Sequence, residues 1–141
     1  HPTNLGMRIR TAGGAGCSAL VITARGGALL DESVVRASAG AVFHLPVIAA
    51  AKLPDTLRRL QQAGFWVYGM DPGGHESVFS VSWPDRCVLV MGNETNGMRG
   101  PVQKCCDALL RIPLARELDS LNVAVAAGIA LFQVAAARSP A

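Results

Sequence analysis

Short, uninterrupted apolar runs alternate along this chain with segments that have the character of helices. The runs that we expect to form strands lie at residues 19–23, 42–48, 65–70, 87–91 and 108–113, with a short edge element at 78–81. Continuous apolar runs of this kind are typical of strands that are buried on both faces of a parallel sheet. The pattern therefore predicts an α/β fold, with a parallel sheet flanked by helices on both faces.

Helix signals fill the segments between these runs. We expect helices at residues 5–15, 31–38, 54–62, 101–106 and 122–137. Asn4 and Asp31 suit N-cap positions, because a short polar side chain can accept a hydrogen bond from the first helical turn. Pro54 suits a first turn and Gly64 suits the residue after a last turn. Pro46 would mark the end of the second strand or an edge position.

Two small polar residues open the last helix, which is otherwise almost wholly apolar. Ser120 and Asn122 stand at its start, where a polar side chain can cap the helix and also face a ligand. Glycine and alanine within the helix would let another backbone approach closely. The segment therefore predicts a site at the start of a tightly packed helix.

Two polar loops follow the last two strands, at the sheet edge where ligands bind in such folds. The loop over residues 92–100 contains three glycines and one carboxylate, Glu94, which could orient an arginine or a ligand donor. The second loop spans residues 114–122. Just before it, Pro113 ends the strand and exposes the backbone groups of Ile112 and Leu114, which suit recognition of an adenine edge. Taken singly, each loop is also compatible with an ordinary polar turn or helix cap.

Composition narrows the class of protein. The 141 residues form one domain with enough apolar residues for a core, and no apolar run reaches the length of a membrane span. A net charge of +3 permits a nucleic-acid partner without requiring one. The four cysteines form no C-x-x-C pair and the three histidines are scattered, so we expect no disulfide, no metal site and a cytoplasmic location.

The polar segments together resemble the SpoU/TrmH-type RNA ribose 2′-O-methyltransferases of the SPOUT superfamily. The first motif is matched at residues 4–6 and 10–12, the second at 89–94 with Gly97, and the third at 112–114 and 120–126. The resemblance covers nearly the entire chain. Within the family, the chain is most similar to the bacterial 23S rRNA guanosine-2′-O-methyltransferases, although tRNA enzymes share these motifs.

The resemblance implies a fold, a cofactor and a set of site residues. The fold would carry a C-terminal trefoil knot, and the protein would work as a homodimer on rRNA or tRNA, without a metal. S-adenosylmethionine (SAM) would be the cofactor, and its contacts would be Gly92, Ile112, Leu121, Leu114 and Met91. The catalytic set carried over from the family is Arg10, Asn4, Glu94, Ser120 and Asn122.

Arg10 is the residue that the resemblance places closest to the chemistry. An arginine side chain keeps its proton in proteins, so we expect it to polarise the ribose hydroxyl or grip the adjacent phosphate rather than act as a free base. Glu94 would hold Arg10 in place, with Arg10 serving an active site formed with the partner subunit. The chain departs from the family at Thr95 and Asn96, where many relatives carry more glycine.

Because His1 falls within the first motif, the resemblance leads us to expect that residues 1–141 are a catalytic domain, without the family's preceding strand or its N-terminal RNA-binding extension. Two other functions remain open from the residues. One is a non-catalytic module that binds SAM or RNA, and the other is a flavodoxin-like domain that binds a nucleotide. The presence of all five residues in the catalytic set argues against the first.

Overall fold

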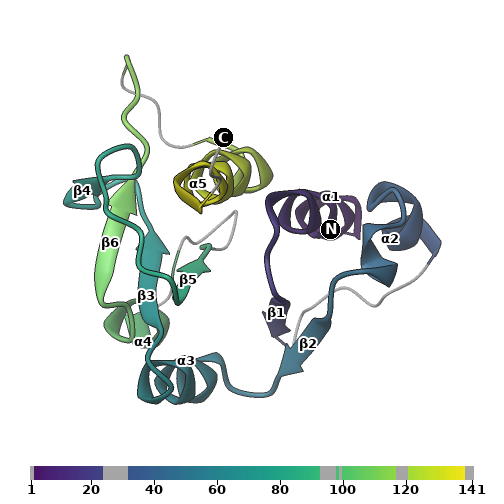
Figure 1. Cartoon of the computed structure of the whole chain (residues 1–141), viewed down its shortest axis with the longest axis horizontal. Coiled ribbons are helices and arrows are strands. Elements are labelled where there is room, and N and C mark those ends of the chain that lie inside the picture. Colours follow the sequence, from purple (N-terminus) through teal and green to yellow (C-terminus); the bar gives the residue numbers. More distant parts are fainter. Residues whose placement is uncertain (1, 24–31, 93–97, 99, 117–120, 139–141) are drawn as a thin grey trace. The chain divides into compact units, whose positions relative to one another are not determined.

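The computed structural model describes residues 2–23, 32–92, 98, 100–116 and 121–138, which fall into two compact units (Figure 1). Unit 1 comprises His1–Lys52 and Ala127–Ala141, and unit 2 comprises Leu53–Ala126. Each unit contains its own parallel sheet, so the prediction of parallel strands alternating with helices is confirmed. None of the helices in the described ranges has both the length and the apolar character that a membrane crossing requires.

Unit 1 is built on a pair of parallel strands and four helical elements. Its elements are α1 (Pro2–Ala15), β1 (Leu20–Thr23), α2 (Glu32–Ala37), the 3₁₀ turn η1 (Ala41–Phe43), β2 (Val47–Ala50) and the larger part of α5 (Val123–Arg138). Leu20 pairs with Val47 and the register continues to Thr23 and Ala50. Buried Leu5 and Ile9 of α1 pack with Val34 and Leu45, which gives this unit its own apolar core.

The approach of α1 to α2 depends on a glycine. A Cβ atom built on Gly6 would lie 2.5 Å from the Cβ of Ala37 and 2.8 Å from the carbonyl oxygen of Val34. Both distances are shorter than van der Waals contact, so only glycine lets the two helices come this close. Near the other end of α1, a Cβ on Gly14 would meet only Phe132, at 3.8 Å.

Unit 2 carries the larger sheet. Its elements are α3 (Leu53–Gln62), β3 (Trp66–Met70), β4 (Glu76–Ser77), β5 (Cys87–Val90), α4 (Gly100–Lys104), β6 (Ala108–Arg111) and the first turn of α5. The strand order is β4-β6-β3-β5, and every pairing is parallel. β3 therefore lies between β5 and β6, two strands that come later in the chain (Figure 1).

Asp107 locks the start of β6 to the start of β3. Its carboxylate accepts hydrogen bonds from the Val67 N–H at 2.7 Å and from the Gln61 amide at 3.1 Å, and its own N–H donates to the Val67 carbonyl at 2.7 Å. The Gln61 amide also donates to the Cys105 carbonyl at 2.7 Å. Because four residues from α3, β3 and the α4–β6 link share these bonds, the register of β6 on β3 is strongly specified.

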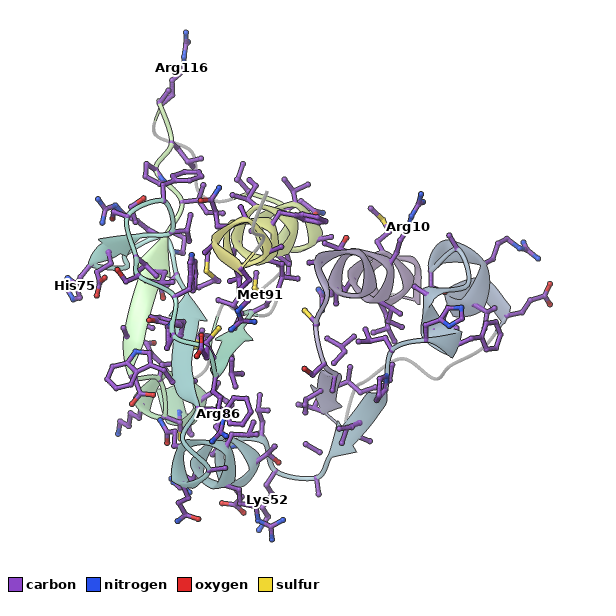
Figure 2. All side chains as sticks on the ribbon, in the orientation of Figure 1. Arg10, Lys52, His75, Arg86, Met91 and Arg116 are labelled. Atoms are coloured by element: carbon purple, nitrogen blue, oxygen red, sulfur yellow. The ribbon has the colours of Figure 1, made fainter. Side chains whose placement is uncertain are left out.

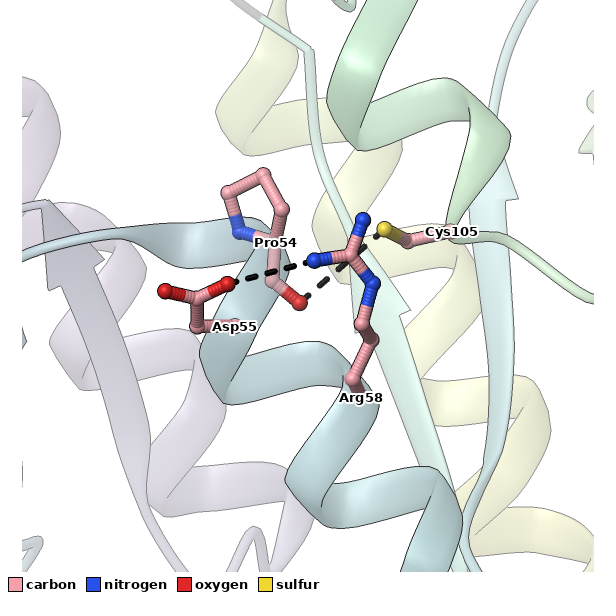
Figure 3. Close-up of polar contacts among 4 residues, drawn as sticks. All are labelled: Pro54, Asp55, Arg58 and Cys105. Atoms are coloured by element: carbon pink, nitrogen blue, oxygen red, sulfur yellow. Dashed lines mark hydrogen bonds and ion pairs between the residues drawn. The ribbon is translucent and has the colours of Figure 1, made fainter.

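The start of α3 faces the end of α4. The buried Cys105 thiol lies 3.9 Å from the Pro54 carbonyl oxygen, beside the Asp55–Arg58 ion pair (Figure 3). That pair is 3.2 Å long but well exposed to water, so it contributes little to stability. Burial of Leu57 with Val67 and Val90 accounts for the attachment of α3 to the sheet.

Three predicted boundaries are wrong, each for a local reason. The chain over 42–48 is not one strand, because Ala39 and Gly40 both have positive φ and turn it into η1, and β2 begins only after Pro46. Asn4 lies inside α1 rather than at its N-cap, because the helix already begins at Pro2. The edge element at 78–81 is instead β4. The role of Gly64 after α3 is confirmed by its φ of 94°.

Asn122 caps α5. Its side-chain oxygen accepts the N–H of Ala124 at 2.8 Å and that of Val125 at 3.3 Å. The buried positions of the helix are small or slender, namely Ala124, Ala127, Ala130 and Val134. The expected capped helix with a small-residue face is therefore confirmed.

A substitution pair within α1 tests the close approach of the two helices. We expect Gly6→Ala to lower the free energy of unfolding by about 2 kcal/mol, because the added methyl overpacks the contact with α2. Gly14→Ala adds the same methyl to the same helix at ordinary van der Waals distance from Phe132, so it should be neutral or slightly stabilising. Urea denaturation of both variants is the measurement. Equal destabilisation by both would show that helix packing at Gly6 is not the cause.

A second pair tests the cap on α5. Asn122→Ala should cost about 1 kcal/mol, because two helical N–H groups lose their acceptor, whereas Asn122→Asp keeps an acceptor oxygen and should cost much less. Thermal unfolding followed by circular dichroism would rank the two. If both variants melt together with the unaltered protein, the cap does not stabilise the helix.

Candidate functional site

The carboxyl edge of the unit 2 sheet is where the predicted cofactor residues gather. Because the strands are parallel, β3, β5 and β6 all end at this edge. Met91 and Gly92 follow β5 directly, and Ile112 and Leu114 follow β6. Leu121 belongs to the same unit, just before α5. All five predicted cofactor contacts therefore lie in unit 2, outside its helices and strands.

The surface at this edge combines apolar side chains with unused backbone groups. Four of the five residues are half-buried, and Leu114 is exposed. Among the described residues, no hydrogen bond outside the helices and strands uses the backbone N–H or carbonyl of these five. Backbone polar groups need a partner, either water or a ligand. Together with apolar side chains, they suit a flat heteroaromatic ring with a polar edge, such as adenine.

The loop after β3 is fastened onto β6 at the same edge. The N–H of Asp71 donates to the Leu110 carbonyl at 2.9 Å, and the Asp71 carboxylate accepts the N–H of Gly73 at 2.7 Å. A Cβ on Gly74 would lie 2.5 Å from the carbonyl carbon of Leu110. Glycine is therefore required where this loop crosses β6.

Arg111 holds this loop from the strand beneath it. Its guanidinium donates to the carbonyl oxygens of Gly74 at 3.2 Å and His75 at 2.9 Å. The sequence gives no sign of this role of Arg111. The Asp-Pro-Gly-Gly pattern indicates a turn, but nothing in it indicates that the turn folds back across a strand that follows it in the chain.

Met98, in the segment between β5 and α4, packs against Cys106. The Cys106 thiol lies 3.7 Å from the Met98 sulfur, and a Cβ on Gly69 would come within 2.8 Å of both side chains. Burial raises the pKa of the Cys106 thiol from 9.0 to about 11, and Cys105 and Asp107 add to the rise. Cys106 is therefore a neutral packing group near pH 7, not a nucleophile.

The predicted catalytic residues are divided between the two units. Arg10 lies on α1 in unit 1, exposed, and its side chain points away from β1 and β2 (Figure 2). Asn4 lies on the same helix, but its side chain is outside the described part. Asn122 caps α5 in unit 2, whereas Glu94 and Ser120 lie outside the described residues. Their catalytic roles stay predictions.

Within the described ranges, no three His, Cys, Asp or Glu side chains come together in an arrangement that could hold a metal ion. The four cysteines are free thiols; Cys105 is buried and the other three are half-buried.

Known proteins share both the sequence and the fold of this chain. It is 40% identical over 132 residues to the 23S rRNA (guanosine-2′-O-)-methyltransferase RlmB of Xanthomonas axonopodis pv. citri, which covers 94% of this chain and 53% of that protein. A second RlmB, from Pseudomonas aeruginosa, is 38% identical over 99% of this chain and 56% of its own length. The chain thus spans about half the length of the curated relatives it matches.

Solved structures agree. The SpoU methyltransferase AviRb from Streptomyces viridochromogenes, in complex with AdoMet, matches with a TM-score of 0.88 and 30% identity over 98% of this chain and 54% of that chain. The AdoMet-bound rRNA methyltransferase from Sinorhizobium meliloti matches with a TM-score of 0.84 and 35% identity over 94% of this chain and 51% of that chain. The α/β architecture with parallel strands is therefore that of SpoU methyltransferases.

A family model covers almost all of the chain. The model of the SpoU rRNA Methylase family matches residues 1–132 of the 141. The match contains the carboxyl edge of the unit 2 sheet, Arg10 on α1 and the cap of α5. Because of this match, and because the chain is 40% identical to a 23S rRNA (guanosine-2′-O-)-methyltransferase, it belongs to the SpoU rRNA methylase family.

Proposed function

We propose that the protein transfers a methyl group from SAM to a ribose 2′-hydroxyl of RNA, with rRNA as the favoured substrate and tRNA as the other. The observation that carries the proposal is the carboxyl edge of the unit 2 sheet. Four residues that follow its strands, together with Leu121 of the same unit, offer backbone groups that no other described residue binds outside the helices and strands, and all except Gly92 add an apolar side chain. Two structural relatives carry AdoMet in their solved structures, which supports the same cofactor here.

The residues that would hold SAM are Met91, Gly92, Ile112, Leu114 and Leu121. Their backbone groups would bind the polar edge of the adenine, and the side chains of Ile112 and Leu121 would cover its faces. When bound, SAM supplies an activated methyl group on a positively charged sulfonium. The Asp71–His75 loop, fastened by Arg111, would keep the rim of this site in a fixed shape.

The RNA-binding side of the site would have to align the ribose hydroxyl and stabilise the negative charge that develops on its oxygen. A 2′-hydroxyl is a weak nucleophile, so it must be placed in line with the methyl group and helped to lose its proton. Arg10 would donate hydrogen bonds to that oxygen or to the adjacent phosphate, and Glu94 would orient Arg10. Both actions stabilise developing negative charge without requiring the guanidinium to lose a proton.

Asn122 can serve the cap and the substrate at once. Its side-chain oxygen is occupied by the N–H groups of Ala124 and Val125. The amide nitrogen of the same side chain still carries two hydrogens that can be donated. Asn122 would therefore direct a fixed donor toward the ligand, beside Ser120, while Asn4 would complete the polar site.

The quaternary arrangement is part of the proposal. The protein would act in the cytoplasm as a homodimer whose chains each carry a C-terminal trefoil knot, and Arg10 of one chain would serve the cofactor bound by the other. The apolar side chains exposed on α5, Val125 and Phe132, and the neighbouring half-buried Ile129 support a partner for that helix.

Arg10→Ala should abolish methyl transfer while SAM binding survives, because the proposed cofactor contacts all lie in the other unit. Tritium transfer from labelled SAM to rRNA measures the first quantity and calorimetry measures the second. Arg36→Ala is a matched control, because Arg36 is an exposed arginine of the same unit and is paired with Glu32.

Two results would count against this assignment. Near-normal turnover by Arg10→Ala would remove Arg10 from the mechanism. SAM binding by the unaltered protein without transfer to either rRNA or tRNA would favour the non-catalytic binding module instead.

A mixing experiment tests whether the active site is shared. Arg10→Ala lacks the catalytic side chain, and Leu114→Glu places a charge at an exposed position of the proposed cofactor site. If each site uses residues of two chains, the co-refolded inactive variants should recover about a quarter of the normal activity, in mixed dimers. The transfer assay measures this recovery.

Each inactive variant, refolded alone in the same way, serves as a control. Failure of the first mixture to gain any activity, together with a monomer mass in light scattering, would contradict the shared site.

A further inference from the structure

Phe43 is an aromatic side chain that the fold of unit 1 leaves in water. It is 74% exposed, the highest value among the large hydrophobic side chains of the described residues. An open hollow of about 340 Å³ lies beside it, lined by Val42, Phe43, His44, Leu45, Pro46 and Val47. That volume is at the lower end of the range for small-ligand sites. A large exposed aromatic beside a hollow of this size offers a flat apolar face to a ring-shaped ligand.

The turn that carries Phe43 is held rigidly on both sides. The N–H groups of Phe43 and His44 donate back to Gly40 and Ala41, at 3.1 and 2.9 Å. On one side the buried Ser38 hydroxyl donates to the Val35 carbonyl at 2.8 Å. On the other, Leu45 is buried in the core of the unit. The exposure of Phe43 is therefore a consequence of the fold and not of a loose segment.

Charge is distributed unequally between the two units. Unit 1 has six arginine and lysine residues against two acidic ones, whereas unit 2 has seven against eight. The basic excess of the chain thus lies in the unit that carries Phe43. A net basic unit with an exposed aromatic side chain favours a polyanion with flat rings, which is the chemistry of single-stranded nucleic acid.

The helix face that bears Arg10 leads to the same turn. Gly6, Arg10 and Gly13 are spaced four and three residues apart, so they share one face of α1. A Cβ on Gly6 would meet Ala37 at 2.5 Å, and one on Gly13 would meet Ala41 at 3.4 Å. Arg10 therefore shares the face of α1 that packs against residues 37–41, and this segment continues directly into the turn that carries Phe43.

We infer that Phe43 is a stacking platform for an unpaired base of the substrate RNA, next to the nucleotide that Arg10 engages. The inference rests on the proposed function and adds a recognition residue to it. The ring of Phe43 would stack on the face of the base, and the hollow over residues 42–47 would receive the edge of that base. The exposed His44 beside it would donate to the base or to its sugar.

Filter binding of a 23S rRNA transcript tests the inference. Phe43→Ala should weaken binding about tenfold, since stacking on an aromatic side chain is lost, and Phe43→Trp should retain it. Phe79→Ala is the matched control, because Phe79 is 56% exposed but belongs to unit 2. Affinity for SAM should not change in any of these variants.

Salt dependence separates stacking from charge. The slope of log affinity against log salt should stay unchanged in Phe43→Ala, because no phosphate contact is removed, and fall by about one in Arg10→Ala. A loss of RNA affinity in Phe43→Ala with an altered slope would indicate a general collapse of the basic surface and overturn the inference.

Two further outcomes decide the matter. If Phe43→Ala binds RNA as well as the unaltered protein does, the inference is overturned. If the same variant also forms a weaker dimer in light scattering, a second copy of the chain, and not RNA, occupies the surface around Phe43. The proposed function fails separately, if the unaltered protein binds the transcript but transfers no methyl group to RNA.

Discussion

Parallel pairing of β3 with two strands that follow it in the chain is the constraint on which the candidate site depends. β3 lies between β5 and β6, so the residues after these strands must meet at one edge of the sheet. The Asp107 carboxylate sets this arrangement from the opposite edge, through its bonds to Val67 and Gln61. A slip of β6 by one residue would break those bonds and turn Ile112 to the other face.

The loop over residues 71–75 shows why the site needs more than strand order. Backbone bonds, a glycine without room for a side chain and the Arg111 guanidinium all fasten this loop to β6. A mobile rim would have to be ordered each time a ligand bound, at a cost in binding free energy. Fixing the rim in advance leaves the backbone groups of Gly92 and Leu121, which no other described residue binds outside the helices and strands, ready for a ligand.

Periodicity in the sequence predicted the parallel α/β class and most of the elements, because buried parallel strands require continuous apolar runs. The prediction of one strand over 42–48 was wrong because Ala39, just before it, adopts a positive φ that alanine rarely has and that the sequence therefore does not indicate. The cofactor residues could be proposed because they follow strands directly. The roles of Arg111 and Gly74 could not, since they depend on a contact between a loop and a strand more than 30 residues later.

Under the proposed function, the two units would serve different partners. Unit 2 is almost neutral and offers backbone groups and apolar side chains, which suit a compact cofactor with a polar edge. Unit 1 carries the basic excess, Arg10 and the exposed Phe43, which suit a large polyanion. A methyl donor with a positive sulfonium would be repelled by a pocket of strong positive charge, so the near balance of basic and acidic residues in unit 2 favours its binding there.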